Sequence, residues 1–186
     1  MELSIEAIRS RTSVRTYADE ALTDEDRRIL HRAFEEAVPG PFGARPRFLL
    51  AARDEIEDEA SRAGSVKGGL RIGTYGMIVG PRAFISGVVP KQPFACVDFG
   101  YCLEGIILRA TEIGLGTCWI GGAFGRGAIA RALGARKDEF VPATTPVGRA
   151  AEGRSLKERL VRGSARAETR KEPSELFIEV DGDGRL

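Results

Sequence analysis

One stretch constrains the fold more than any other. It runs from Asp98 to Gly122 and reads DFGYCLEGIILRATEIGLGTCWIGG. Asp98 can cap a helix start, and apolar side chains then recur at helical spacing as far as Ile113. A helix that is apolar around most of its circumference is buried in a core or an interface. Gly114 stands where a left-handed cap would end this helix, and a short β-prone run leads on to Gly121 and Gly122. Paired glycines after a strand allow backbone to approach a ligand closely, although the stretch alone also fits a core helix, its cap and a core strand.

Helical and extended patterns surround this stretch. Thr23 begins a helix with Asp26 at the capping-box position, and Pro39-Gly40-Pro41 ends it. Pro142 and Pro146 interrupt a later strand, which predicts that this strand lies at an edge of the sheet. The other expected elements are helices over 4–10 (with Ile5 and Ile8 inward), 54–63 and 128–133, strands over 48–52, 83–89 and 140–147, and a glycine-rich loop over 64–80.

Charge and cysteine content exclude several classes of function. The 28 Lys and Arg residues are balanced by 27 Asp and Glu residues, so no nucleic acid or other polyanion is implied as a partner. The three cysteines form no CxxC pair, and with a single histidine, His31, they argue against a disulfide framework and a zinc site. No apolar run is long enough to span a bilayer, so we expect no membrane segment and, by default, a cytoplasmic location.

A candidate anion site lies near the N-terminus, in the run Arg11-Thr-Ser-Val-Arg15. Its β-branched residues favour an extended backbone, in which alternate side chains point to one side. Arg11, Ser13 and Arg15 would then share a side, and two guanidinium groups with a hydroxyl make a good phosphate clamp. The alternative is an arginine-rich surface loop.

The C-terminal part is polar and basic. Residues 149–172 contain eight Lys or Arg residues against four Glu residues. We interpret them as a solvated helix and linker within a single domain that covers residues 1–186. A sharper alternative is that Arg170 and Lys171 return to the phosphate site.

Three motifs together resemble the signatures of the nitroreductase family, in order and approximate spacing, over roughly residues 5–178. The first is the run from Arg11 to Tyr17, which is similar to the family's Arg-x-Ser-x-Arg-x-Phe/Tyr opening. The second is Asp98-Phe-Gly followed by the run from Gly114 to Gly122. The third is Arg170-Lys171 followed by Glu175-Leu-Phe.

The resemblance implies an α+β fold with a mixed, mostly antiparallel sheet flanked by helices, and it implies FMN bound between two subunits. Arg11, Ser13 and Arg15 would hold the FMN phosphate, with Arg170 or Lys171 as a further positive contact. The residues implied along the flavin ring are Trp119, Ile120, Gly121 and Gly122, with the backbone N–H of Gly122 near the flavin N5. The implied activity is an NAD(P)H oxidoreductase that reduces nitro compounds, quinones or similar acceptors, and the implied assembly is a homodimer.

One segment departs from the family pattern. The family carries Ser-x-x-Asn-x-Gln-Pro-Trp after its second helix, and this chain has Gly43 and Arg45 at the Asn and Gln positions, with Pro46 retained. The departure resembles the N-terminal half of a branch in which two nitroreductase-like halves are fused, so the chain is expected to be a fragment or a lone half. The alternative function is therefore a non-catalytic half that serves as a dimerisation or pseudo-dimer module and binds flavin weakly or not at all.

Overall fold

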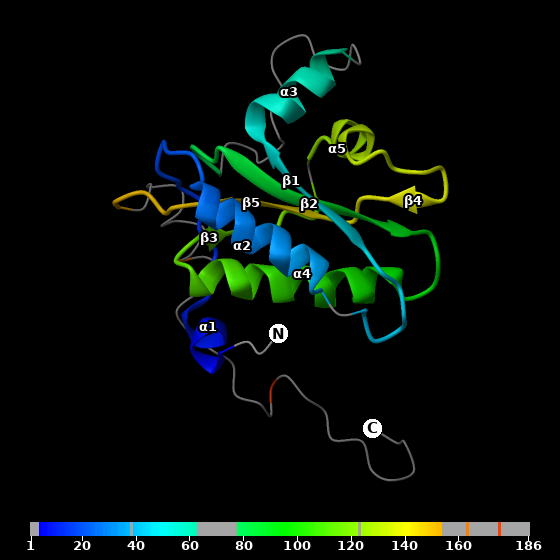
Figure 1. The fold of residues 1–186 in the computed structure, drawn as a ribbon, viewed down its shortest axis with the longest axis horizontal. Helices are drawn as coiled ribbons and strands as arrows, with labels where there is room; N and C mark the ends of the chain where they lie inside the picture. The colour runs from blue at the N-terminus through cyan, green and yellow to red at the C-terminus, as the bar shows by residue number, and fades with distance from the viewer. Residues whose placement is uncertain are drawn as a thin grey trace. The chain divides into compact units, whose positions relative to one another are not determined.

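A computed structural model of the chain describes residues 4–37, 39–62, 78–122, 124–153, 163 and 175 (Figure 1). The chain divides into two compact units, residues 1–153 and 154–186. The glycine-rich loop predicted over 64–80 falls almost entirely outside the described residues, as do the helix within 149–172 and both Arg170 and Lys171. The structure of the first unit carries the functional argument.

The described part of the first unit contains five helices and five strands. The helices are α1 (Ile5–Ser10), α2 (Asp24–Glu35), α3 (Arg53–Arg62), α4 (Ala95–Glu112) and α5 (Arg126–Ala132). The strands are β1 (Arg47–Ala52), β2 (Ala83–Pro90), β3 (Gly116–Thr117), β4 (Glu139–Phe140) and β5 (Thr144–Gly148).

The strands form one sheet in the order β1-β2-β5-β3, with β4 paired to one end of β2. Every pair of named strands is antiparallel, and β1 runs against β2 from Arg47 opposite Val88 to Ala52 opposite Ala83. Two isolated bridges, from Ser13 and Thr16, are parallel. The sheet is therefore mixed and mostly antiparallel, as the sequence predicted.

The prediction that the proline-interrupted strand is an edge strand was wrong, because β5 lies between β2 and β3. Thr144 exchanges backbone hydrogen bonds with Ile120, so Pro146, two residues on, presents its nitrogen to the same side. Cys118 lies opposite Pro146 in the same register, and it donates its N–H to the Thr145 hydroxyl. The proline therefore interrupts the ladder at this one pair, where a side chain supplies the acceptor.

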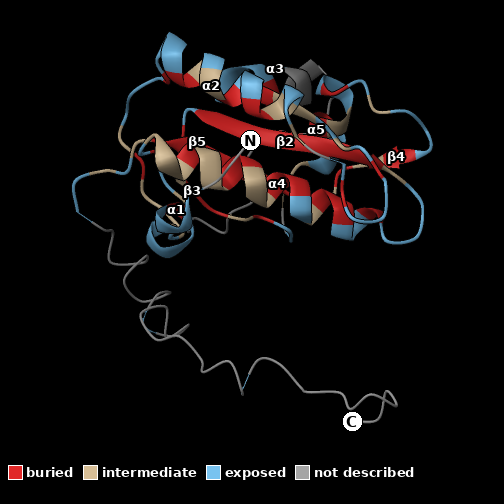
Figure 2. Ribbon diagram, turned by 60° about the horizontal axis from the view of Figure 1, so that its bottom comes forward, coloured by how far each residue is buried: buried red, intermediate tan, exposed pale blue. Residues whose placement is uncertain are grey.

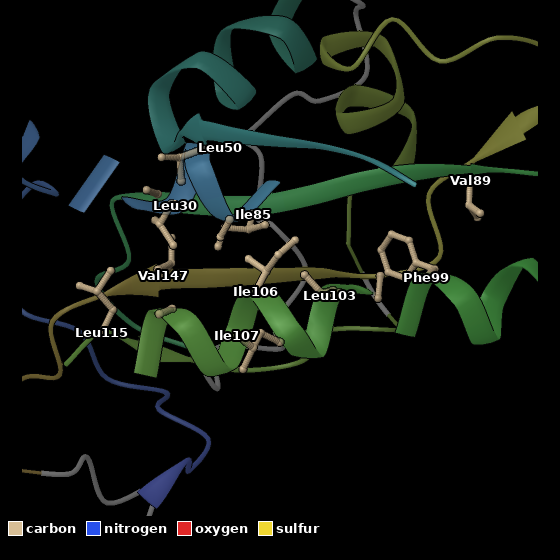
Figure 3. Close-up of a cluster of buried hydrophobic side chains, with 14 of the residues drawn as sticks. Leu30, Leu50, Ile85, Val89, Phe99, Leu103, Ile106, Ile107, Leu115 and Val147 are labelled. Carbon is tan, nitrogen blue, oxygen red and sulfur yellow. The ribbon is translucent and has the colours of Figure 1, made fainter. Parts of the chain in front are cut away.

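Helices cover both faces of the sheet. The larger core cluster joins one face to α2 and α4, and Figure 3 shows Leu103 and Ile106 of α4 on the side of the helix that faces Ile85 and Val147 of the sheet. The smaller cluster joins the other face to α3 and α5. β2 contributes alternate side chains to the two clusters and is buried along nearly its whole length (Figure 2). The first unit therefore folds as helices on both sides of one central sheet.

The central helix begins four residues earlier than the sequence suggested, and Asp98 is not its cap. α4 starts at Ala95 after Phe94, whose left-handed backbone (φ 62°) makes the turn. Asp98 lies on the buried side of the helix, and its carboxylate binds another part of the chain, as described below. The predicted left-handed cap at Gly114 is confirmed, with φ 76°.

For the first two helices, one prediction is confirmed and one was wrong. The capping box of α2 is confirmed, because the Thr23 hydroxyl accepts from the N–H of Asp26 and the Asp26 carboxylate accepts from that of Thr23. In α1 the inward orientation of Ile5 and Ile8 was wrong, since both are exposed and Ala7 is the buried residue. α1 contacts α4, and the N–H of Ser4, the residue before α1, donates a hydrogen bond to Glu112 Oε1 of α4.

Candidate functional site

The two sequence motifs predicted to bind one cofactor lie side by side in the fold. Ser13 forms a parallel bridge with Thr117 of β3, and the N–H of Val14 donates to the Thr117 carbonyl at 2.8 Å. The segment is therefore extended, as predicted. A Cβ on Gly116 would lie 2.6 Å from the Val14 side chain, so glycine at this position allows the two backbones to approach.

Arg11 carries donors that the described residues leave unused. Its Nε and Nη2 are buried without a hydrogen-bond partner, and its nearest charge is Glu104 Oε1 of α4, 3.5 Å from Nε. Buried polar groups in native proteins almost always have a partner, so an orphaned guanidinium edge is suited to receive an anion. The Thr117 hydroxyl, buried beside Ser13, also lacks a partner in the described part of the chain.

Neither the Ser13 hydroxyl nor the Arg15 guanidinium is held by another described residue. Arg11 and Arg15 lie in the same extended segment, and Glu104 is the carboxylate that the described residues pair with Arg11. An anion with several acceptor oxygens would meet both hydroxyl and guanidinium donors here.

Trp119 and Ile120 are held firmly next to these donors. The half-buried Trp119 donates from Nε1 to Glu104 Oε2 at 2.7 Å, and Ile120 exchanges two backbone hydrogen bonds with Thr144 of β5. Glu104 thus bridges Trp119 and Arg11, a role that was not predicted from the sequence. The signal available in the sequence was the position of Glu104, an acidic residue one helical turn from the buried positions of the helix.

Gly121 and Gly122 present open backbone. A Cβ on either would meet no atom within 4 Å, and neither has a positive φ, so the fold itself does not require glycine there. Both carbonyl oxygens accept from the guanidinium of Arg126, at the start of α5. Arg126 was also missed, because one more arginine close behind a glycine pair is a weak signal in an arginine-rich chain.

A buried aspartate shapes the loop where the sequence departs from the family pattern. Asp98 is fully buried, and its two oxygens accept from the N–H groups of Phe42 and Ala44, each at 2.7 Å. The loop also places Phe42 in a stacked pair with Phe94, with 4.6 Å between ring centroids, and both rings are exposed. Asp98 stands on the apolar stripe of its helix, which signalled burial, although not the partner.

The shifted pKa values belong to groups outside the clamp. Burial raises the pKa of the Cys102 thiol, and the nearby Asp98 charge adds to this. The hydrogen bond from Arg47 lowers the pKa of Glu139, helped by the N–H of Arg136. The N–H of Ser4 and the side chain of Arg109 lower the pKa of Glu112. These groups serve packing and pairing, and they do not form an acid–base pair at the candidate site.

Two further searches covered the same described residues. None of their helices combines the length and apolarity that a membrane crossing requires. No group of three or more His, Cys, Asp or Glu side chains among them is placed to hold a metal ion.

The sequence-predicted site residues separate into three sets. Residues 11–15 and 117–119 come together at one edge of the sheet. Ile120, Gly121 and Gly122 continue directly from that edge, beside β5 and α5. Arg170 and Lys171 lie outside the described residues.

Comparison with known proteins connects this arrangement to one family. The sequence matches the family described as Putative TM nitroreductase over residues 4–184. No curated protein sequence matches it.

Similar solved structures have the same architecture. A nitroreductase from Desulfovibrio desulfuricans in complex with FMN is 24% identical, with 94% of this chain and 95% of that chain covered and a TM-score of 0.64. A nitroreductase family protein from Clostridium difficile 630 is 17% identical, with coverage of 96% and 98% and a TM-score of 0.66. A variant of the FMN and NADPH-dependent nitroreductase NfnB from Sphigopyxis sp. strain HMH is 18% identical, with coverage of 94% and 97% and a TM-score of 0.67. These likenesses confirm the predicted nitroreductase-like α+β fold.

Proposed function

The chain belongs to the Putative TM nitroreductase family, and we propose that it is an FMN-dependent oxidoreductase that uses NAD(P)H to reduce nitro compounds, quinones or similar acceptors. The observation that carries the proposal is the orphaned, buried guanidinium edge of Arg11 beside the Ser13–Thr117 bridge. Two of the similar solved structures are a nitroreductase in complex with FMN and an FMN and NADPH-dependent nitroreductase, which supports the choice of cofactor.

The donors present fit the phosphate of FMN. Arg11 Nε and Nη2, the Ser13 hydroxyl and the Arg15 guanidinium supply hydrogen bonds and two positive charges, and the described residues use none of these for a hydrogen bond. Charge-assisted bonds of this type are about twice as strong as neutral ones, so the clamp would contribute much of the cofactor affinity. Arg170 and Lys171 would add a second positive contact.

The adjoining backbone fits a planar ring. Trp119 and Ile120 are fixed by Glu104 and Thr144, and Gly121 and Gly122 leave open space where side chains would stand. FMN, when bound, supplies the electron-transfer chemistry. The chain's part is to hold the phosphate, to offer the Gly122 N–H to the N5 edge of the ring, and to leave one ring face open to NAD(P)H and the acceptor.

A second candidate is a non-catalytic half that serves as a dimerisation module. Gly43 favours it, because by resemblance it stands where the family carries an Asn that binds the flavin ring, and Arg45 stands where the family carries Gln. The enzyme is the better-supported function, since the clamp donors are retained and unused.

We infer a homodimer, and the surface of the central helix supports it. Val97 and Tyr101 of α4 are exposed beside the stacked pair of Phe42 and Phe94, so large apolar side chains gather at this end of the helix. Monomers rarely expose contiguous apolar patches, and a two-fold contact between copies would cover this one. The implied dimer would bring Gly121 and Gly122 of one copy close to residues 41–48 of the other.

Absorption spectroscopy of the purified protein, combined with light scattering at micromolar concentration, tests the proposal. The enzyme is expected to be a dimer with a flavin band near one equivalent per chain or per dimer after incubation with FMN. A dimer without flavin would favour the non-catalytic half. A monomer that binds no flavin would contradict both candidates.

A further inference from the structure

Arg126 gathers four carbonyl groups on one guanidinium. Its Nη1 donates to Gly122 O at 2.9 Å and its Nη2 to Gly121 O at 2.5 Å. Its Nε donates to Val141 O at 3.2 Å, and Nη2 also reaches Pro142 O at 3.4 Å. The guanidinium therefore ties the glycine pair to the segment between β4 and β5.

The position of the guanidinium is itself fixed. Its carbon lies 4.3 Å from the centre of the Phe124 ring, within the range of a cation–π contact. Arg126 is the first residue of α5, and Ile129 of that helix is packed in the smaller core cluster. The packed helix α5 thus holds Gly121 and Gly122 through the side chain of Arg126.

This arrangement determines where the Gly122 N–H points. A trans peptide is planar, and its N–H and C=O are directed oppositely. Because the Gly121 carbonyl is turned onto Arg126, the N–H of Gly122 in the same peptide is turned away from Arg126. No described residue accepts a hydrogen bond from the Gly122 N–H, so this donor is available to a ligand.

We propose that Arg126 is a positioning residue that locks the Gly121–Gly122 peptide so that the Gly122 N–H is held ready for the flavin N5. The inference rests on the proposed function and adds to it the residue that orients the ring contact. Oxidised N5 carries a lone pair that accepts a hydrogen bond, whereas N5 of the reduced ring carries a hydrogen and accepts poorly. A locked donor therefore favours the oxidised cofactor.

The test compares Arg126→Met with the wild type and with Arg131→Met, which removes a positive charge from the same helix. FMN affinity is measured for the oxidised and the reduced cofactor, together with the midpoint potential of the bound flavin. Loss of one neutral hydrogen bond is expected to weaken oxidised FMN about fivefold in Arg126→Met and to leave reduced FMN unchanged. That ratio corresponds to a midpoint potential about 20 mV higher for a two-electron couple. Arg131→Met is expected to match the wild type.

Other results would overturn the inference. Equal weakening of oxidised and reduced FMN would mean that Arg126 supports the fold of the loop and does not aim a donor at N5, and unchanged binding would mean that it does neither. If Arg126→Met does not fold, Arg126→Lys replaces it, since lysine keeps the charge but lacks the fork that holds two carbonyls, and the same unequal weakening is expected. A wild type that binds no FMN would refute the proposed function itself, which separates that failure from a failure of the role of Arg126.

Discussion

Asp98 and Arg11 both place a charge against the central helix, and the fold treats the two charges in opposite ways. Asp98 belongs to α4, and each of its oxygens accepts a backbone N–H at 2.7 Å. Arg11 packs beside α4 at Glu104, and its Nε and Nη2 have no hydrogen-bond partner among the described residues. Because burying an unpaired polar group is costly, the first charge stabilises the chain, whereas the second is held ready for an external partner.

Two glycines repeat this contrast. A Cβ on Gly40 would lie 2.2 Å from the side chain of Asp98, so packing demands a glycine in the loop that Asp98 holds. A Cβ on Gly122 would meet nothing, so the chain's own packing gives no reason for a glycine there. Around Asp98 the hydrogen bonds are made within the chain and the space is filled. Around Arg11 and Gly122 there are hydrogen-bond donors without a described partner and open space.

The largest effect is expected from removing Asp98. Asp98→Ala leaves the N–H groups of Phe42 and Ala44 without their acceptor, and the free energy of unfolding should fall by about 3 kcal/mol. Urea unfolding of the flavin-free protein measures this, with the exposed Glu20→Ala as the control. If Asp98→Ala were as stable as the control, Asp98 would not be the structural charge of the pair.

A second satisfied carboxylate sharpens the comparison. Glu139 of β4 accepts from Arg47 and Arg136 and is nearly buried, so Glu139→Gln should lower the free energy of unfolding by about 2 kcal/mol at neutral pH. These bonds lower the pKa of Glu139 in the folded state, so its contribution is complete above its ordinary value of 4.5 and is lost as the pH falls through the folded pKa.

The measurement is urea unfolding of both proteins across the acid range, with the exposed Glu20→Gln as the control. The gap between wild type and Glu139→Gln should close below pH 4.5. A gap that stays constant down to the lowest pH would mean that the carboxylate charge is not the source of the stability.

Much of the fold could be predicted because it depends on local patterns. The capping residues of α2, the left-handed Gly114 and the apolar stripe of α4 are all written in short stretches of sequence. The prediction failed where a distant segment decides the outcome. Pro146 suggested an edge strand, but the Thr145 hydroxyl accepts the N–H of Cys118 at this point of the sheet. Asp98 suggested a helix cap, but its carboxylate binds the loop at Phe42 and Ala44.

The candidate site shows the same division. The alternation from Arg11 to Arg15 indicated an anion clamp, and the paired glycines indicated open backbone. The residues that were missed, Glu104 and Arg126, act on other residues of the site across the fold. Their roles depend on which helix lies beside which loop, and the spacing of residues along the chain does not predict that arrangement.

The clamp should lose ligand binding without losing stability. Arg11→Ala removes donors that make no internal hydrogen bond, so FMN affinity should fall about tenfold while the free energy of unfolding changes by less than about 1 kcal/mol. Fluorescence titration of FMN and urea unfolding measure the two quantities. Arg9→Ala, which removes an exposed positive charge from α1, is the matched control and should change neither. Loss of stability with intact FMN binding would reverse the roles assigned to Asp98 and Arg11.

The smallest effect is expected at Glu104, and it has the opposite sign. Glu104 Oε1 lies 3.5 Å from Arg11 Nε, so its negative charge offsets part of the clamp's positive charge. Its other oxygen accepts from Trp119, and glutamine can keep that bond with its amide oxygen. The Glu104 side chain is 40% exposed, so the ion pair contributes little to stability.

Glu104→Gln should therefore bind FMN about threefold more tightly and leave the free energy of unfolding within about 0.5 kcal/mol of the wild type. The gain should shrink as salt is added, because added ions screen an exposed charge. Glu36→Gln makes the same change in net charge at an exposed site, and it should bind FMN as the wild type does. Weaker binding in Glu104→Gln would show that the carboxylate holds Arg11 in place for the phosphate. In that case Arg11 would also depend on a partner within the chain, Glu104. Arg11 and Asp98 would then differ only in how many of their hydrogen bonds are made inside the protein.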